Sequence, residues 1–328
     1  KTRTHLIKIS KATEKNINIA AKLLLKGGIV AFPTETVYGL GALANDKKAI
    51  KRIYEVKGRP KNNPLIVHVY DINQALSITK NIPIDAHVLI KKYWPGPLTL
   101  ILPYKESSNI SSIARANLKT VAVRIPNHPV ALKLLKAVNM PLIAPSANIS
   151  QHLSPTSASH VKKDLGINLI VGKDMILNGG STSIGLESTV IDFTSIKPII
   201  LRPGGLDINL INKDVKVSYI DKKLNNDLPI SPGLFKKHYS PNASLRLNAK
   251  FPLQGEGWLG FGKEPKNIAA FTKMNLSLTG DLNEAATNLF AMLRLLDEKN
   301  IKNIAIKPIP NKEIGVAIND RLNRGASN

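Results

Sequence analysis

Hydrophobic and polar positions along the chain follow helical spacing in some segments and strand-like runs in others. Apolar residues recur at helical spacing over residues 13–26, and two glycines end that run before the apolar stretch IVAF. This spacing predicts a helix that leads into a buried strand. The same criteria predict helices over 46–56 and 129–138, and strands over 65–69, 98–102, 121–125 and 141–144. The mixture of helices and strands indicates an α/β sandwich.

A break in the regular pattern divides the chain. After the strand-like stretches STVIDF and PIILRPGG, the pattern lapses from about residue 207 to residue 239, which includes the polar stretch DKKLNNDLP. We expect the domain boundary there. The predicted parts are a first domain over 1–206, a linker over 207–241 and a smaller domain over 242–328.

The third part has the pattern of a small α/β unit. Its strand candidates are GWLGF, NIAAF and NIAIK, and they surround a long helix predicted over 282–299. A short helix ending in INDRLNR follows. The sequence therefore predicts a small three-layer α/β unit.

Composition agrees with a globular protein of two domains. The chain has 328 residues, of which 43% are hydrophobic, enough to bury two cores. No apolar run approaches the roughly 20 residues that span a bilayer, and the start KTRTHLIKIS lacks the apolar core of a signal peptide. We expect a soluble, cytoplasmic protein without membrane contact. The absence of cysteine excludes disulfides, thiolate metal sites and thiol redox chemistry.

The net charge of +23, from 46 Lys and Arg against 23 Asp and Glu, raises the question of a nucleic-acid partner. However, the excess is spread along the chain as lysine, beside abundant asparagine and isoleucine, with no arginine-rich tail. Charge alone is therefore weak support for RNA binding.

Two loops beside apolar strands carry groups suited to a ligand. PTETVYGLG (33–41) offers hydroxyls such as that of Thr36, and glycines that let a ligand approach the backbone. VKGRPKNNPLIVHV (56–69) places Lys57 and Arg59 next to prolines that stiffen the loop, as a polyphosphate site requires. An ordinary turn and a solvated lysine cluster are the respective alternatives.

Two further loops follow apolar strands in the same way. APSANIS (144–150) presents small hydroxyl and amide groups that can cradle a phosphate or a nucleobase, although a helix N-cap is the favoured alternative for it in isolation. ESTVIDF and ILRPGG place Ser188, Thr189 and Arg202 beside two strands. Arg202 could equally be an ordinary surface charge.

Several enzyme classes are not indicated. The nearest match to a nucleotide-binding P-loop, GFGKEP, has Glu264 after the lysine where serine or threonine is required. HExxH, GxSxG and paired metal-ligand histidines are also missing from the sequence. His68 lies within a predicted strand, and only its position next to the basic loop distinguishes it from a packed histidine.

Taken together, these segments resemble the YrdC-type family, specifically its long two-domain threonylcarbamoyl-AMP synthases. The similarity covers residues 26–241 and rests on PTETVYGLG, KGRPKNNPLIVHV, WPGPLTLIL, VAVRIPNHPVALKLL, PLIAPSANIS, ESTVIDF, ILRPGG and SPGLFKKHYSP, with AINDRLNRGA resembling the second domain. The family's paired signature corresponds here to Lys57, Arg59, Ser146 and Asn148. Gln151 is a departure, since relatives often have glycine after this turn.

The resemblance implies a fold and a reaction. The fold would be a YrdC-like twisted-sheet α/β domain followed by a smaller Rossmann-like three-layer α/β domain. The enzyme would be a nucleotidyltransferase that joins L-threonine, bicarbonate and ATP into threonylcarbamoyl-AMP and releases pyrophosphate. Proteins that transfer the threonylcarbamoyl group to tRNA would then use the product. Such chemistry depends on positioning and charge neutralisation and requires no catalytic triad.

The resemblance also implies roles for individual residues. The signature residues Lys57, Arg59, Ser146 and Asn148 would be catalytic. The threonine-binding residues would be Thr36, His68, Arg124, Ala144 and Ser188, with Arg124 gripping the carboxylate. The ATP-binding residues would be Lys57, Arg59, Asn63, Thr120, Ser146, Ser154, Arg202, His238 and Tyr239. Residues 207–241 would form a linker that closes as a lid over the active site.

Mg²⁺ would be bound mainly by the phosphates of ATP, because the loops offer few carboxylates. We expect no dedicated protein metal site, and a direct contact from Glu35 is an unsupported alternative. A non-catalytic, basic RNA-binding module of the YrdC type is the alternative function, and direct contact with tRNA stays open. A carbamoyl-transfer maturation factor fits poorly, because its cysteine-rich zinc elements are missing.

Overall fold

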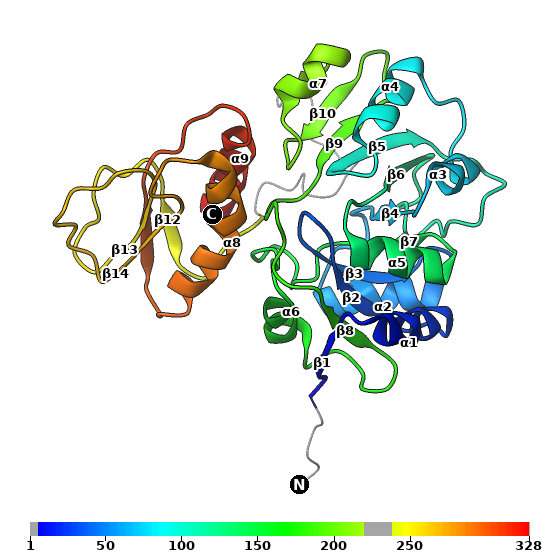
Figure 1. Ribbon diagram of the computed structural model, residues 1–328, viewed down its shortest axis with the longest axis horizontal. Coiled ribbons are helices and arrows are strands. Elements are labelled where there is room, and N and C mark those ends of the chain that lie inside the picture. Colours follow the sequence, from blue (N-terminus) through cyan, green and yellow to red (C-terminus); the bar gives the residue numbers. More distant parts are fainter. Residues whose placement is uncertain (1–5, 220–237, 328) are drawn as a thin grey trace, which may run out of the picture.

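The computed structural model describes residues 6–219 and 238–327, which form two α/β units side by side (Figure 1). The larger unit contains an 11-stranded sheet and the smaller one a 4-stranded sheet. Most of the predicted linker segment SPGLFKKHYSP lies outside the described residues, which resume at His238. In the described part of the chain, no helix combines the length and the hydropathy needed to cross a bilayer.

The large sheet mixes parallel and antiparallel neighbours. Its strands, in spatial order, are β1 (Ile9–Lys11), β8 (Met175–Asn178), β2 (Val30–Pro33), β3 (Tyr38–Leu43), β7 (Leu142–Ile143), β4 (Ile66–His68), β6 (Thr120–Arg124), β5 (Leu98–Pro103), β9 (Thr189–Asp192), β10 (Ile199–Arg202) and β11 (Ser218–Tyr219). β4 and β6 are parallel, with His68 opposite Arg124 at the carboxyl end of each strand. Ligands of α/β sheets bind at such ends.

Alternation along the strands assigns the two faces of the large sheet to two helical layers. Val30 and Phe32 of β2 belong to an apolar cluster with α1 and α5, whereas Ala31 belongs to the main cluster with α2, α4 and α6 on the other face. The helices of this unit are α1 (Glu14–Leu25), α2 (Lys47–Lys57), α3 (Ile72–Ile78), α4 (Ile84–Tyr93), α5 (Pro129–Val138), α6 (Ala158–Leu165) and α7 (Ile208–Asp214). A strand with apolar residues on both faces must be covered on both sides.

The smaller sheet is parallel throughout. Its strands, in spatial order, are β12 (Ser244–Arg246), β15 (Asn303–Ile306), β13 (Gly257–Gly260) and β14 (Thr272–Asn275). Leu259 and Ile304 pack with α8 (Leu282–Asp297) and α9 (Gly315–Ala326), whereas Trp258 packs against Ile268 and Ala270 on the opposite face. The third layer is thus an irregular segment. Figure 1 shows α8 and α9 between the small sheet and the larger unit.

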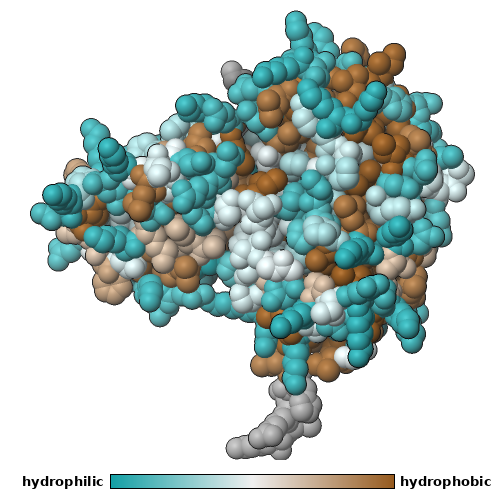
Figure 2. Space-filling view, in the orientation of Figure 1, coloured by the Kyte–Doolittle hydropathy of each residue, from teal (hydrophilic) through white to brown (hydrophobic). Residues whose placement is uncertain are grey.

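The surface reflects this packing. On the face shown in Figure 2, hydrophilic side chains cover much of the outer end of the smaller unit, and hydrophobic side chains reach the surface more often over the larger unit. The apolar side chains of α8, such as Leu289 and Phe290, are fully buried. These residues belong to an apolar cluster that also includes Val37, Leu153 and Leu186 of the larger unit.

Most elements predicted in the first domain are confirmed. α5 has the predicted bounds, and α1 begins after Thr13, whose hydroxyl caps the helix by accepting a hydrogen bond from Asn16 N at 3.2 Å. The fold class is confirmed as well.

The predicted lapse after residue 207 is wrong up to residue 219. α7 follows its N-cap Asp207, and β11 adds a parallel edge strand beside β10. α7 has 7 residues and buries only two of them, and β11 has 2 residues that are both exposed, so neither leaves a clear period in the sequence.

Three local predictions are also wrong. NIAAF is not a strand. It is an irregular segment in which Ile268 and Ala270 are partly buried and cover Trp258, and the strand β14 follows it. The last residues of PTETVYGLG belong to β3 and not to a loop. APSANIS caps no helix, because the next helix, α6, begins after Ser157.

Candidate active site

A small cavity in the larger unit gathers most of the predicted site residues. Its lining consists of Thr36, Val37, Arg59, Ile66, His68, Arg124, Ala144, Pro145, Ser146, Glu187, Ser188, Arg202, His238 and Tyr239. Its volume is about 50 Å³, room for one or two waters and far below the roughly 300 to 1,000 Å³ of small-molecule sites. A bound nucleotide would therefore not fit into the cavity as it stands in this structure.

Arg124 is held rigidly at one side of the cavity. Its Nη1 donates to Thr36 Oγ1 at 3.0 Å, its Nε donates to Gly96 O at 3.1 Å, and its Nη2 forms an ion pair with Glu35. Glu35 is fixed in turn by Asn127 N, which donates to its second oxygen at 3.0 Å. A guanidinium held in this way is preorganised to bind a carboxylate.

His68 is a neutral hydrogen-bond acceptor next to Arg124. Its Nδ1 donates to Ile66 O at 3.1 Å, because a carbonyl can only accept, and the tautomer therefore leaves Nε2 unprotonated. Burial and the charge of Arg124 lower the pKa of His68 to about 3. A neutral Nε2 can accept a hydrogen bond from a hydroxyl or an ammonium group.

Ser188 and Arg202 form a hydrogen-bonded part of the cavity lining. Arg202 of β10 donates from Nε and Nη2 to Ser188 O at 3.1 and 3.0 Å, and from Nη2 to Ser188 Oγ at 3.2 Å. Thr99 Oγ1 lies 2.7 Å from the same hydroxyl. The antiparallel pairing of β9 with β10 brings these residues together. Arg202 is buried and is therefore no ordinary surface charge.

Lys57 is not an exposed loop cation, as its position in the sequence suggested. It is the last residue of α2, its side chain is 1% exposed, and its Nζ donates to Ser146 O and, at 2.6 Å, to Asn148 O. Burial and the nearby Arg59 lower the pKa of Lys57 well below its ordinary value. Lys57 therefore holds the APSANIS turn and does not line the cavity itself.

Arg59 follows Lys57 and does reach the cavity. Gly58, in the left-handed conformation with φ of 60°, ends α2 and redirects the chain. Arg59 Nη2 then donates to Pro64 O at 3.0 Å. Burial lowers the pKa of Arg59 to about 10, so the guanidinium stays charged near neutral pH.

The remaining predicted residues lie around or away from the cavity. Asn63 and Asn148 are both 1% exposed, and each has a side-chain oxygen without a hydrogen-bond partner in the described part of the chain. Ser154 is fully buried and donates to Glu187. Thr120 pairs with Pro103 at the end of β6 opposite Arg124 and does not line the cavity. Its position gives no support to an ATP contact.

Gln151 adopts the conformation that glycine favours. Its φ is 71°, in the left-handed region, and its carbonyl accepts from Ser240 N at 2.9 Å. The turn thus keeps its shape despite the departure from the pattern of relatives.

His238 and Tyr239 close the cavity from the start of the second unit. The two rings lie 3.9 Å apart, and Tyr239 stacks on Phe290 of α8 at 5.8 Å between centroids. Arg321 of α9 lies over the ring of Tyr239, with Cζ 4.9 Å from the centroid. His238 and Tyr239 are both buried, at 7% and 2% exposure.

Three charged residues next to the cavity had no supported role in the sequence-based predictions: Glu187, Arg321 and Glu35, of which Glu35 was considered only as an unsupported contact for Mg²⁺. Glu35 and Glu187 lie inside recognised motifs, and a buried acid in a cationic loop cluster could have signalled them. Arg321 lies in the predicted C-terminal helix, where the sequence INDRLNR distinguishes it from no other arginine.

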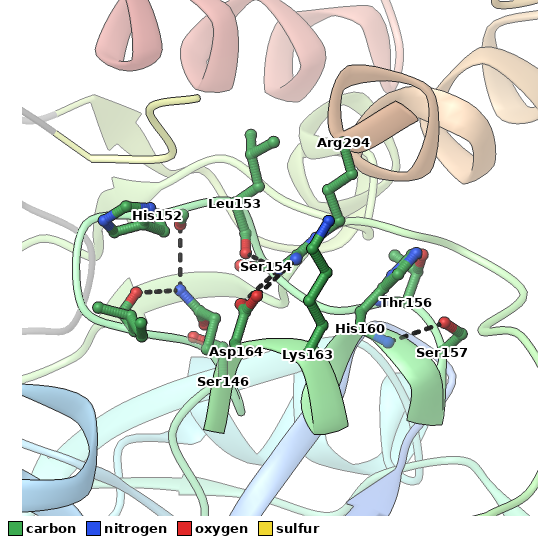
Figure 3. A network of polar contacts seen from close by, with 12 residues as sticks. Ser146, His152, Leu153, Ser154, Thr156, Ser157, His160, Lys163, Asp164 and Arg294 are labelled. Carbon is green, nitrogen blue, oxygen red and sulfur yellow. Dashed lines mark hydrogen bonds and ion pairs between the residues drawn. The ribbon is translucent and has the colours of Figure 1, made fainter. Parts of the chain in front are cut away.

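Further contacts join the two units next to the site. Figure 3 shows Arg294 of α8 reaching Asp164 of α6, with Nη1 to Oδ1 at 2.8 Å and Nη2 to Oδ2 at 2.7 Å. Arg294 also donates to Leu153 O, and Lys163 pairs with Glu298. The described residues contain no cluster of three or more side chains suited to hold a metal.

The chain matches two family models. Residues 22–204 match the model described as "Telomere recombination", and residues 194–327 match "Threonylcarbamoyl-AMP synthase, C-terminal domain". The crystal structure of E. coli YciO matches with a TM-score of 0.54 at 24% identity. The match covers 61% of this chain and 96% of that one, and it supports the fold.

Curated relatives match nearly the whole chain. The threonylcarbamoyl-AMP synthase of Pyrococcus abyssi is 40% identical over 334 residues, covering 95% of this chain and 94% of the relative. That of Bacillus subtilis is 41% identical over 322 residues, covering 94% and 92%. The crystal structure of P. abyssi Sua5 complexed with L-threonine has a TM-score of 0.85 at 37% identity, covering 98% and 97%. The chain therefore belongs to the threonylcarbamoyl-AMP synthase family and is an enzyme.

Proposed function

We propose that this chain joins L-threonine, bicarbonate and ATP into threonylcarbamoyl-AMP and releases pyrophosphate. One observation carries the proposal: a single cavity combines a rigid guanidinium beside a neutral imidazole with two further buried arginines, Arg59 and Arg202. The solved relative that binds L-threonine has the same fold over nearly the full chain. The cavity thus offers separate groups for a carboxylate and for phosphates.

The proposed threonine pocket is the side of the cavity around Arg124. Arg124 would bind the substrate carboxylate, and His68 Nε2 would accept a hydrogen bond from the hydroxyl or the amino group. The hydroxyls of Thr36 and Ser188 and the backbone of Ala144 complete this side. These polar groups are already fixed by protein contacts, so binding needs little reorganisation.

The proposed ATP site is the side around Arg59, Ser146 and Arg202. Arg59 and Arg202 would contact phosphates, while Lys57 would position Ser146 and Asn148 through their carbonyls. Bicarbonate would give carbon dioxide and hydroxide, and the neutral amine of threonine would add to the carbon dioxide and lose a proton, which forms water with that hydroxide. An oxygen of the resulting carbamate would attack the α-phosphorus and displace pyrophosphate. Fixed cations stabilise the charge that develops on the phosphoryl oxygens.

Mg²⁺ would be held by the phosphates of ATP and by water. The two nearby carboxylates, Glu35 and Glu187, are each bound by an arginine, and this donor set does not favour direct coordination. The cation would supply further charge neutralisation on the phosphates. We propose that tRNA-modifying transferases consume the product.

We propose that the end of the linker acts as a lid. The cavity is too small for a nucleotide, and His238 and Tyr239 form part of its wall. In this proposal the two residues move to admit ATP, and their return excludes water from the reactive adenylate.

Formation of threonylcarbamoyl-AMP and pyrophosphate from ATP tests the proposal. Product should require both threonine and bicarbonate, and omission of either should abolish it. Product formation that is independent of threonine would contradict the proposed reaction, and no ATP turnover at all would favour the RNA-binding alternative.

Substrate choice gives a sharper test of the threonine pocket. Serine should be a poor substrate and 2-aminobutyrate a worse one, because a site that hydrogen-bonds a hydroxyl leaves buried polar groups unpaired when that hydroxyl is missing. The measurement is kcat/KM for each amino acid at saturating ATP. Equal use of threonine and 2-aminobutyrate would exclude a hydroxyl contact.

A further inference from the structure

Glu187 introduces a negative charge into a cavity wall that otherwise carries arginines. It lines the cavity next to Ser188 and is 6% exposed. Close to the phosphates of ATP, an uncompensated carboxylate would oppose binding, because like charges repel strongly where water is excluded. The wall can accept a nucleotide only if this charge is balanced.

Arg321 of the second unit supplies that balance from behind the wall. Its side chain is 1% exposed, and its Nε donates to Glu187 Oε2 at 2.7 Å. Nη1 donates to Pro203 O at 2.9 Å and to Asp320 Oδ2 at 2.7 Å. Ser154 donates to the other oxygen of Glu187. The carboxylate is thus bound on both oxygens, one by each unit of the protein.

We propose that Arg321 is a positioning residue through which the second unit completes the nucleotide site, by neutralising Glu187 and so fixing Ser154 and the wall that faces the phosphates. This inference rests on the proposed ATP-dependent function. The guanidinium does not line the cavity, so it acts through Glu187 and, from its place over the ring, through Tyr239.

Docking of the two units does not by itself account for this pair. Arg294 and Asp164 already form a bidentate contact between the units outside this cavity. Buried ion pairs contribute little net stability compared with apolar residues of similar size. A function beyond docking would explain why a buried arginine is placed against Glu187, the carboxylate that lines the cavity among residues 6–219 and 238–327.

The test compares parent, Arg321→Gln, Glu187→Gln and the double variant, all in the full-length chain. We would measure binding of a non-hydrolysable ATP analogue by calorimetry, KM for ATP and for threonine, and the melting temperature. Arg321→Gln should weaken analogue binding and raise KM for ATP by about 10-fold or more, with little change in KM for threonine, because it leaves Glu187 unpaired. Glu187→Gln should bind the analogue at least as tightly as the parent, since it leaves the positive charge of Arg321 unopposed behind the wall that faces the phosphates.

The double variant separates charge from structure. It should restore analogue binding to within about threefold of the parent, because no unpaired carboxylate remains. Arg321→Lys, which keeps the charge, should rescue part of the loss. Asp164→Asn is the matched control, since it weakens another contact between the units, and it should leave KM for ATP unchanged.

Several outcomes would overturn the inference. A lower melting temperature in Arg321→Gln without weaker analogue binding would make the pair purely structural. Equal effects from Asp164→Asn would assign the loss to docking, and a double variant as weak as Arg321→Gln would exclude charge neutralisation. If Arg321→Gln fails to fold, the double variant and Arg321→Lys still decide the point. A parent that binds the analogue but forms no threonine-dependent product would contradict the proposed reaction alone.

Discussion

Two buried arginine–carboxylate pairs stand at the cavity, and they face it in opposite ways. In the pair Arg124–Glu35 the arginine lines the cavity and the carboxylate lies behind it, whereas in the pair Arg321–Glu187 the carboxylate lines the cavity and the arginine lies behind. Both pairs are buried, with side-chain exposures of 4% and 8% in the first and 1% and 8% in the second. The partner in front therefore sets what the wall presents to a ligand.

The origin of the partners differs as well. Arg124 and Glu35 both belong to the larger unit, whereas Arg321 belongs to the smaller one and Glu187 to the larger. The first pair presents a held cation, suited to a carboxylate. The second neutralises a carboxylate where phosphates are proposed to bind. The two pairs are thus proposed to serve different functions, and removing both partners of a pair should have a different effect in each case.

The largest effect is expected from Arg124→Gln. It leaves Glu35 as an unpaired buried charge, which should lower the free energy of unfolding by about 3 to 5 kcal/mol. It also removes the proposed contact with the threonine carboxylate, so threonine-dependent pyrophosphate release should be lost. Urea denaturation and the pyrophosphate assay measure the two effects separately.

The double variant Glu35→Gln/Arg124→Gln tests whether the two pairs differ in function. It should regain most of the stability but none of the turnover, because Arg124, which lines the cavity, is the proposed contact for the threonine carboxylate. The double variant of the second pair should instead regain ATP affinity. Recovery of threonine-dependent turnover in Glu35→Gln/Arg124→Gln would remove the proposed role of Arg124.

A pH effect is expected from His68, the strand neighbour of Arg124. Burial and Arg124 lower its folded pKa to about 3, against 6.5 for an ordinary histidine. Below pH 6.5 the unfolded chain takes up a proton that the folded chain does not, so this group favours unfolding as the pH falls towards 3. The contribution approaches about 1.4 kcal/mol per pH unit.

His68→Gln should remove that contribution. The free energy of unfolding, measured by denaturant titration between pH 6 and pH 4, should fall less steeply with decreasing pH in the variant than in the parent. Equal slopes would mean that the folded protein does not lower the pKa of His68, so that His68 is protonated in the folded protein across this pH range.

A smaller effect is expected from Asp164→Asn, outside the cavity. The pair with Arg294 is largely buried, at 10% and 13% exposure, and loss of its charge should cost about 1 to 3 kcal/mol of stability. KM for ATP and for threonine should not change, because neither residue lines the cavity. A raised KM for ATP would show that docking of the units, and not the charge of Glu187, controls the site.

The smallest effect is expected from Lys163→Ala. Its ion pair with Glu298 also joins the two units, but the side chains are 58% and 46% exposed. Such pairs contribute less than about 1 kcal/mol, and salt screens them. Melting temperatures at low and high salt should match those of the parent, whereas a clear loss of stability would show that exposed contacts help to hold the units together.

Local sequence was sufficient to predict much of the fold and much of the site. α1 and α5 follow from helical spacing and capping, because these signals depend on residues within one or two turns. The resemblance carried by the loop motifs indicated Arg124, His68, Ser188 and Arg202, and the structure brings all four to one cavity. The roles proposed for these residues stay predictions until the assays above are done.

Contacts between distant segments could not be predicted in this way. The sequence placed Lys57 among the phosphate ligands, yet its Nζ donates hydrogen bonds to the carbonyls of Ser146 and Asn148, which are 89 and 91 residues away. NIAAF has the apolar run of a strand but covers a sheet face, because such a run shows that the segment is in contact with a core and not which partner it packs against.

The sequence by itself determined many of the elements, the family and most of the residues that line the cavity, since short-range periodicity and motifs encode them. Tertiary structure alone decided which charge of each ion pair faces the cavity. Arg321 and Glu187 are 134 residues apart and meet only when α9 packs against the larger unit. No local pattern specifies such a pair, because its energy depends on burial and on the approach of two separately folded surfaces.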